Sequence, residues 1–182
     1  MSDPPVMPFD ISSWNKPDRG VLVKTFIASA VKMNGVVDPR DSRRTLLHWR
    51  GGGGYRLGLS DRSTSFDTRT AKDENGRPCV QVQLISKDFQ VSRTAPYHWQ
   101  VELAKDYTTT QIFNLMVAHN FNRYAYNGNG SGCLTWTTAL VKLLEDNGVL
   151  PPGSLKGFLE TVAKARADPQ YWVPDEPGAH FF

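Results

Sequence analysis

The sequence has few cysteines and none of the short motifs that usually indicate a metal or nucleotide site. Only Cys79 and Cys133 occur, and the chain contains no CxxC, HExxH or Walker-type glycine-lysine motif. Two cysteines do not make a disulfide framework, and we expect both thiols to be reduced in a cytoplasmic setting. The missing motifs remove the strongest sequence arguments for zinc and for nucleotide. We therefore expect no metal and no cofactor.

The sequence also lacks a long apolar segment and an excess of one charge. No apolar run is long enough to span a membrane and no charged-then-apolar leader begins the chain, so we expect no membrane contact, no secretion and a cytoplasmic location. The 21 basic and 18 acidic residues are mixed along the chain. This balance gives no electrostatic footprint for duplex nucleic acid.

Length and composition fit one folded domain. At 182 residues and 40% hydrophobic, the chain can bury a real core, whereas two separate halves would each be marginal. Four prolines interrupt any regular pattern near the start, so residues 1–20 are predicted to form an N-terminal arm. Residues 21–182 are predicted to form a single domain. Nothing in the sequence indicates the oligomeric state.

Strand patterns occupy the middle of the chain. Segments rich in β-branched and aromatic residues predict short antiparallel strands, with a polar loop at residues 34–40. Four glycines at residues 51–54 are predicted to form a turn or bulge, because glycine adds entropy and no side chain to a strand. A phosphate-binding loop is the other interpretation, but no helix with Lys and Ser/Thr follows. The predicted strands are residues 21–28, 45–49, 55–59, 63–68, 80–85 and 97–103.

Helical patterns fill the last part of the chain. Thr108 or Thr109 can cap the first helix, and Leu159 is expected to face inward in the last. Strands followed by helices predict an α+β fold, a single domain with an antiparallel β-sheet packed against helices. The predicted helices cover residues 108–120, 133–147 and 154–167.

One cysteine stands at the start of a predicted helix. Cys133 follows a loop rich in glycine and asparagine, residues 127–132. A thiol in the first helical turn lies near unpaired N–H groups and the positive end of the helix dipole, which favour the thiolate. The alternative is a small apolar residue packed inward behind a cap formed by Asn129, Ser131 or Gly132. Cys133 is our candidate nucleophile.

Two histidines are candidate bases for that cysteine, because histidine titrates nearest neutrality. His48 and His98 each precede a tryptophan in a predicted strand, where alternation sends His and Trp to opposite faces. A partly buried histidine bonded to backbone is the alternative for either one. His119 is explained by a helix C-terminus, and His180 lies close to the end of the sequence. The sequence does not choose between His48 and His98.

A third polar residue usually orients the imidazole by accepting from its second nitrogen. Asp67 lies on the strand after the predicted hairpin that carries His48 and has suitable chemistry, whereas Asp61 and Ser65 are weaker choices. A turn or edge-strand aspartate is the alternative for Asp67. The backbone N–H of Cys133 supplies a donor for an oxyanion.

The order histidine on a strand, acid on a strand, cysteine at a helix resembles the circularly permuted branch of the papain-like, NlpC-type thiol enzymes. Leu47-His48-Trp49, Ser63-Thr64-Ser65-Phe66-Asp67-Thr68 and Gly130-Ser131-Gly132-Cys133-Leu134-Thr135-Trp136 more closely resemble an uncharacterised fungal domain family, over residues 21–182. That family shows an Asn-His-Trp strand, a Ser-Val-Arg-Leu-Asp-Met-like strand and Gly-x-Gly-Cys-Arg-aromatic-Trp. The resemblance implies a papain-like arrangement with Cys133, His48 and Asp67 as functional positions.

The resemblance also implies supporting residues and exposes two departures. Trp49 and Trp136 would support the site. Leu47 stands where the family has Asn, and Leu134 where it often has Arg. Any substrate contact made by those polar residues is therefore missing here. The candidate substrate-binding residues are Trp49, Tyr126, Gly132, Trp136 and His98.

Together these residues predict a cysteine-dependent acyl-transfer enzyme acting on an amide, ester or thioester substrate. Cys133 attacks the carbonyl, His48 moves the proton and Asp67 orients His48. Transfer to water would make the protein a thiol peptidase or amidase. Transfer to an amine would form amide bonds, as in fungal secondary metabolism, for example in aminoacyl-tRNA-dependent cyclodipeptide synthesis. The sequence leaves the acceptor and the substrate open.

The expected partner is a small-molecule or peptide-like acyl substrate, and aminoacyl-tRNA is a second candidate. A non-catalytic small-molecule binding module with the same fold is the alternative function, with aromatic side chains lining a groove. The basic residues that would meet an aminoacyl-tRNA are Arg40, Arg43, Arg44, Arg50 and Arg56.

Overall fold

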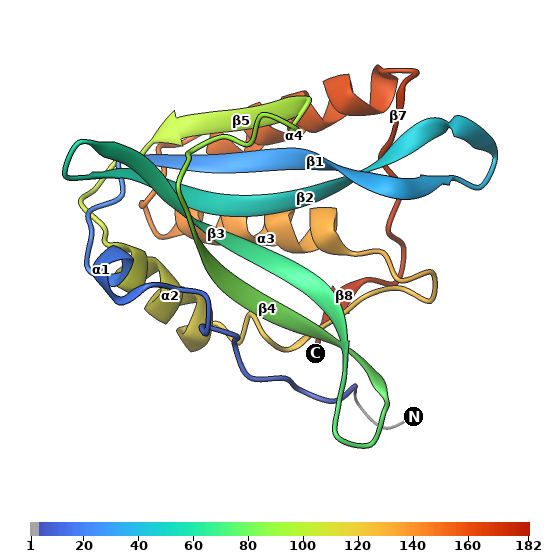
Figure 1. The fold of residues 1–182 in the computed structure, drawn as a ribbon, viewed down its shortest axis with the longest axis horizontal. Helices are drawn as coiled ribbons and strands as arrows, with labels where there is room; N and C mark the ends of the chain where they lie inside the picture. Colours follow the sequence, from blue (N-terminus) through green and yellow to red (C-terminus); the bar gives the residue numbers. More distant parts are fainter. Residues whose placement is uncertain (1–3) are drawn as a thin grey trace.

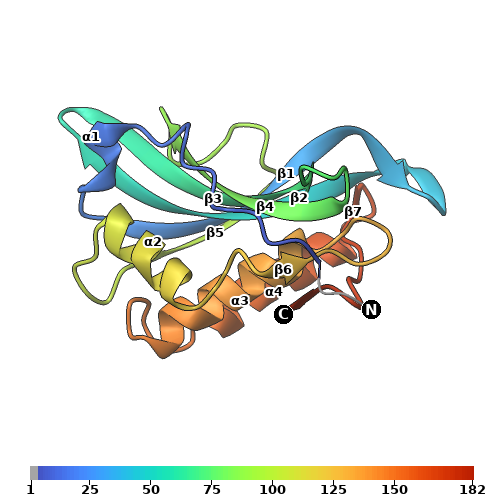
Figure 2. The same cartoon turned by 90° about the horizontal axis from the view of Figure 1, so that it is seen from below.

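A six-stranded sheet forms one layer of the structure, and helices α2, α3 and α4 lie on one of its faces (Figures 1 and 2). The computed structural model describes residues 4–182. Five strands follow the antiparallel order β4-β3-β2-β1-β5, and β7 pairs with β2 in parallel. The predicted single α+β domain with an antiparallel sheet is confirmed. The strands of the sheet are β1 (Thr25–Asp38), β2 (Asp41–Leu57), β3 (Ser60–Lys72), β4 (Pro78–Lys87), β5 (Tyr97–Glu102) and β7 (Tyr171–Trp172).

The helices begin and end at clear local signals. Thr108 caps α2 through a capping box: its Oγ1 accepts from the N–H of Gln111, and Gln111 Oε1 accepts from the N–H of Thr108. One of the two caps expected for this helix is therefore confirmed. Within residues 4–182, no helix combines the length and the apolar character that a membrane crossing requires. The remaining elements are α1 (Lys16–Arg19), α2 (Thr109–Ala118), α3 (Cys133–Asp146), α4 (Ser154–Ala167) and the short pair β6 (Tyr124–Ala125) and β8 (His180–Phe181).

The hairpin between β1 and β2 is longer than expected. The predicted loop at residues 34–40 is mostly strand, because β1 continues to Asp38 and β2 begins at Asp41. The pairing register shifts between Lys32 and Val37. Such a bulge absorbs extra residues without ending a strand, which is why a polar Asn-Gly sequence lies inside β1 rather than at the turn.

One residue of α4 faces solvent against expectation. Leu159 is 44% exposed, whereas Phe158 and Val162 are buried. Successive residues of a helix point about 100° apart, so two adjacent apolar residues cannot both face the sheet squarely. The prediction that Leu159 faces inward is wrong.

The N-terminal segment is held against the domain by aromatic contacts. Trp14 is 3% exposed and its ring lies 5.4 Å from that of Phe113 on α2. Phe9 meets the same ring at 5.2 Å. Further along, Asp10 forms a bridge with Gln83 of β4. These contacts place the segment along the outer strand β4 and across α2.

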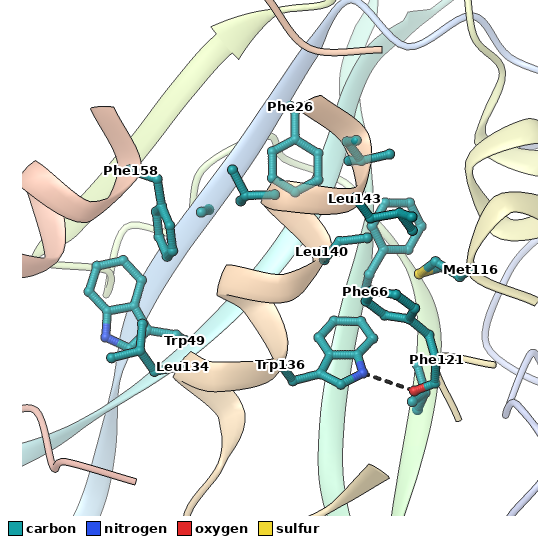
Figure 3. Close-up of a cluster of buried hydrophobic side chains, with 14 of the residues drawn as sticks. Phe26, Trp49, Phe66, Met116, Phe121, Leu134, Trp136, Leu140, Leu143 and Phe158 are labelled. Carbon is teal, nitrogen blue, oxygen red and sulfur yellow. Dashed lines mark hydrogen bonds between the residues drawn. The ribbon is translucent and has the colours of Figure 1, made fainter. Parts of the chain in front are cut away.

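Alternate residues of the strands build the core between the sheet and the helices. Phe26 of β1, Trp49 of β2 and Phe66 of β3 point toward the helices and are at most 1% exposed. Leu140 of α3 and Phe158 of α4 meet them from the other side (Figure 3). The rings of Trp49 and Phe158 pack edge to face at 5.4 Å. The core therefore fixes α3 and α4 against the central strands.

The glycine run lies inside a strand, so the predicted break at residues 51–54 is wrong. Strand β2 passes through all four glycines and pairs with β1 on one side and β3 on the other. A Cβ at Gly51 would lie 2.9 Å from Cζ of Phe26 and 3.1 Å from Cδ2 of Leu140. The missing side chain therefore lets α3 and the Phe26 ring approach the sheet closely, and pairing on both sides offsets the entropy of glycine.

The sheet divides at its centre. Strand β2 pairs with β3 from Gly51, which is opposite Phe66, to Leu57, which is opposite Ser60. The residues of β2 that precede Gly51 pair with β1 and β7, and the residues of β3 that follow Phe66 pair with β4. The two halves diverge, and α3 is visible in the gap between their ribbons (Figure 1). The divergence brings the start of α3 to the backbone of β2.

We expect Gly51→Ala to lower the free energy of unfolding by about 1–3 kcal/mol, because the new methyl group would overpack the core between β2 and α3. Urea denaturation measures the change. Gly20→Ala is the control, since nothing lies within 4 Å of the position where its Cβ would be. Equal effects at the two positions would show that close packing does not explain the glycine run.

Candidate active site

The candidate site lies where β2 and β3 diverge. Pairing between β2 and β3 begins at Gly51, and Trp49 lies two positions before Gly51 in the sequence. Its backbone N–H donates to Sγ of Cys133 at 3.4 Å. The first residue of α3 thus supplies the acceptor that a neighbouring strand would otherwise provide, and the sulfur is held at the backbone of β2.

His48 and Asp67 come from the two strands that diverge. His48 lies on β2 and Asp67 on β3, and His48 Nε2 is 2.6 Å from Asp67 Oδ1. The side chains are 18% and 16% exposed. Oδ1 of Asp67 also accepts from the N–H of Thr68 at 2.8 Å. The carboxylate therefore fixes one ring nitrogen of His48 and leaves Nδ1 for another partner.

The pKa of His48 depends on both of its neighbours, Asp67 and Cys133. Burial alone would lower the pKa of the imidazole, but hydrogen bonds with Asp67 and Cys133, and the negative charges of both, raise that pKa well above its usual value. Because Asp67 engages Nε2, Nδ1 is the nitrogen left for the sulfur. The structure thus brings together the three predicted residues Cys133, His48 and Asp67. The raised pKa keeps the imidazole protonated at neutral pH.

Gly132 is the residue that lets two tyrosines approach the start of α3. A Cβ at Gly132 would lie 2.5 Å from Cδ1 of Tyr126 and 3.1 Å from the hydroxyl of Tyr124. The Tyr124 hydroxyl donates to the carbonyl of Gly132 at 2.8 Å, and the Tyr126 hydroxyl donates to Oγ1 of Thr68 at 2.7 Å. Burial raises the pKa of Tyr126, and the charge of Cys133 raises it further. Tyr126 therefore lies beside the thiol, as a substrate-contacting residue would.

Glu176 from the C-terminal segment caps α3. Its carboxylate accepts from the backbone N–H groups of Thr135 at 2.7 Å and Leu134 at 3.4 Å. It also accepts from the hydroxyl of Ser131 at 2.9 Å, and one oxygen lies 3.9 Å from Sγ of Cys133. These contacts satisfy N–H groups that have no partner within the helix. Glu176 thus connects the C-terminal segment to the loop before Cys133 and to the first turn of α3.

Sequence reasoning missed Glu176. Asn129, Ser131 or Gly132 was the candidate cap of α3, and Gly132 is the N-cap, but glycine has no side chain to make the capping bond. A helix that opens with glycine and cysteine lacks a local cap, and that deficit is the one sequence signal that a distant acid is needed. Nothing in the spacing identifies which acid. The N–H of Cys133 is the one expected to stabilise an oxyanion, while those of Leu134 and Thr135 bind Glu176.

His98 lies apart from these residues. It is exposed on β5 and pairs with Ser29 of β1, so strand β1 separates it from β2. Its neighbours Tyr97 and Trp99 pack against the core, which turns His98 to the face of the sheet away from the helices. His48 rather than His98 is the histidine next to Cys133.

The two tryptophans expected at the site are core residues. Trp49 is 1% exposed and Trp136 is fully buried. The indole N–H of Trp136 donates to the carbonyl of Phe121 at 3.0 Å (Figure 3). Both rings therefore pack in the core between the sheet and the helices, and neither ring has exposed surface that a substrate could contact. Within residues 4–182, no group of three or more His, Cys, Asp and Glu side chains is arranged to hold a metal ion.

We expect the pKa of His48 to lie well above 6.5 and to fall in Asp67→Asn and in Cys133→Ala, because each change removes an interaction that favours the charged ring. Two-dimensional NMR of the imidazole through a pH titration measures it. The raised pKa also makes the ring stabilise the fold below pH 6.5, and this contribution is lost as the pH rises through the raised pKa. An ordinary pKa in the wild-type protein would contradict the assigned contacts.

We expect Glu176→Ala to lower the free energy of unfolding by about 1 kcal/mol, because it removes the cap of α3. Glu176→Gln keeps an oxygen acceptor and should recover part of the loss. Thermal and urea denaturation measure both variants. Glu160→Ala, at an exposed position of α4, is the matched control. A loss no larger than that of the control would show that Glu176 does not stabilise the helix.

Comparison with known proteins assigns the chain to a family. No curated protein and no solved structure matches the chain. A family model described as "Domain of unknown function (DUF7770)" matches residues 27–181, a range that includes Cys133, His48, Asp67 and Glu176. The chain therefore belongs to this family, Domain of unknown function (DUF7770).

Proposed function

We propose that the protein is a cysteine-dependent acyl-transfer enzyme, with Cys133 as nucleophile, His48 as base and Asp67 as the residue that orients His48. The observation that carries the proposal is the grouping of the three side chains: His48 Nε2 lies 2.6 Å from Asp67 Oδ1, and Cys133 is close enough to help raise the pKa of the same ring. A nucleophile next to a base that a third group orients is the arrangement that acyl transfer requires. The raised pKa of His48 supports a ready thiolate–imidazolium pair.

The reaction follows from these contacts. The Cys133 thiolate attacks the substrate carbonyl, and a bond forms between Sγ and the carbonyl carbon. The imidazolium of His48 gives its proton to the leaving group as the bond to that group breaks. Water or an amine then attacks the thioester, loses its proton to His48 and releases the Cys133 thiolate. The backbone N–H of Cys133, the first helical residue, is a candidate oxyanion donor.

The order of the elements supports the same class. Histidine and aspartate on successive strands, followed by cysteine at a helix, is similar to the circularly permuted papain-like, NlpC-type thiol enzymes. In this chain β2 and β3 carry the first two residues and α3 begins with the third. The similarity favours an amide, ester or thioester as substrate and a thiol peptidase, amidase or amide-forming enzyme as the activity.

The charged residues give little support to an aminoacyl-tRNA substrate. Three of the arginines that would meet the RNA form salt bridges with aspartates, at 2.9 Å for Arg43, 3.1 Å for Arg44 and 3.5 Å for Arg56. Their charge is therefore partly neutralised within the protein. A small-molecule or peptide-like acyl substrate fits the site better, and the location we propose remains the cytoplasm.

We expect iodoacetamide to label Cys133 at neutral pH and His48→Gln to slow that labelling by about tenfold or more, because the base that favours the thiolate is lost. Peptide mass spectrometry measures both cysteines in the same sample. Cys79 is the internal control: it is buried, and burial raises the pKa of its thiol, so it should stay unlabelled.

Acylation tests the next step. Para-nitrophenyl acetate should add one acetyl group to the wild-type protein and to Cys79→Ser, but not to Cys133→Ala, as measured by intact mass. Release of acetate or, with an added primary amine, of an acetamide then distinguishes water from an amine as acceptor. A Cys133 that neither alkylates nor acylates would contradict the enzyme and favour a non-catalytic binding module.

A further inference from the structure

A cavity lies on the face of the sheet opposite the helices. Residues of β1, β2 and β3 form its floor, and residues 89–92 of the loop from β4 to β5 form its roof. That loop crosses the sheet in Figure 1 and rises above it in Figure 2. The cavity has a volume of about 20 Å³, which is room for one or two water molecules. A small polar group fits it.

Two cations meet at this cavity. Arg50 from β2 and Lys87 from the end of β4 both line it. Over residues 4–182, neither forms a salt bridge with a carboxylate, whereas most other arginines that line the strands do. The arginines that pair with an aspartate are Arg43, Arg44, Arg56, Arg62, Arg69, Arg77 and Arg166.

The two cations are close enough to affect each other. Burial lowers the pKa of Lys87, the charge of Arg50 lowers it further, and the charge of Asp67 acts in the opposite direction. Asp67, however, is engaged by His48 at 2.6 Å. Two cations without a counter-ion of their own repel each other, and an anion between them would remove that repulsion. The cavity therefore favours an anionic ligand.

Small polar residues form the rest of the lining. Ser29 and Ser65 are each 5% exposed and line the cavity. The Ser65 hydroxyl donates to the carbonyl of Ile85 at 3.4 Å, so Ser29 offers the hydroxyl that can donate to an anion. Gly52 adds no side chain, and a Cβ there would lie only 3.1 Å from the carbonyl oxygen of Thr64. The volume suits the two oxygens of a carboxylate, whereas the four oxygens of a phosphate need more room.

The cavity adjoins the candidate active site. Arg50 is two residues beyond His48 on the same face of β2, and Ser65 is two residues before Asp67 on the same face of β3. Two residues of a strand span about 7 Å. A substrate whose carbonyl is at the site would therefore place a group a few bonds away into the cavity.

We propose that the cavity between Arg50 and Lys87 binds a carboxylate of the acyl substrate, and that it selects acyl groups with a free acid a few bonds from the reacting carbonyl. This inference rests on the proposed function and adds the class of substrate. Arg50 offers a planar fork of donors that matches a carboxylate, and Lys87 adds a second charge. Both residues determine specificity rather than take part in the chemistry.

Binding is tested without catalysis, on the full chain carrying Cys133→Ala. Acetate, phosphate and neutral acetamide are titrated at constant ionic strength while NMR follows the Arg50 Nε–H signal. Acetate should shift the signal to saturation and acetamide should not. Arg50→Gln and Lys87→Gln, followed through the Ser29 and Gly52 amide signals, should weaken acetate binding about tenfold. Arg40→Gln and Lys72→Gln, at exposed positions, are the matched controls.

Selectivity is tested on the protein with its thiol. The para-nitrophenyl monoester of glutaric acid, which keeps a free carboxylate, is compared with para-nitrophenyl pentanoate, which has none. Intact mass measures the rate at which each acylates Cys133. The acid-bearing ester should react about tenfold faster. Arg50→Gln and Lys87→Gln should remove this preference, whereas the control variants Arg40→Gln and Lys72→Gln should keep it.

The outcomes separate the two proposals. Equal rates with the two esters, or tighter binding of phosphate than of acetate, would overturn the carboxylate cavity and leave the acyl-transfer enzyme intact. A lack of acylation by both esters would contradict the enzyme, and the acetate titration would then decide the cavity alone. Acetate binding that Arg50→Gln and Lys87→Gln do not weaken would also overturn it. Thermal denaturation of each variant confirms that it is folded.

Discussion

The divergence of β2 from β3 is the constraint on which the candidate site depends. Backbone groups that lose their strand partner inside a protein must find another, because an unpaired polar group is costly to bury. Trp49 precedes the part of β2 that pairs with β3, and its N–H donates to Sγ of Cys133 instead. The same divergence places His48 and Asp67 on separate strands that meet across the gap. The arrangement that satisfies the sheet also assembles a thiol, an imidazole and a carboxylate.

The sequence predicted the parts of this site that depend on local pattern. Alternation along a strand separates His48 from Trp49, and a loop rich in glycine marks the start of the helix at Cys133. Both signals are read within a few residues. The choice of Asp67 rested on the chemistry that a base requires, and the structure places that carboxylate 2.6 Å from His48. The α+β fold followed from the order of strands and helices.

What the sequence did not predict depends on contacts between distant segments. Glu176 reaches the start of α3 from the C-terminal segment, 41 residues after Thr135, and no spacing rule connects the two. The glycines of β2 suggested a turn because a glycine run weakens an isolated strand, but strands on both sides outweigh that preference. Long-range packing decided each case.

The same glycines have a consequence for how the protein can vary. Gly51 faces the core beneath the sheet, whereas the next residue, Gly52, borders the cavity above it, so two environments are separated by a single layer of backbone. A side chain added at Gly51 would clash with Phe26 and with Leu140 of α3, and one added at Gly52 would clash with the backbone of β3 at Thr64. Substitution at Gly51 therefore bears on the packing of the core, and substitution at Gly52 bears on the cavity that we propose binds a ligand, so two neighbouring positions are constrained for different reasons.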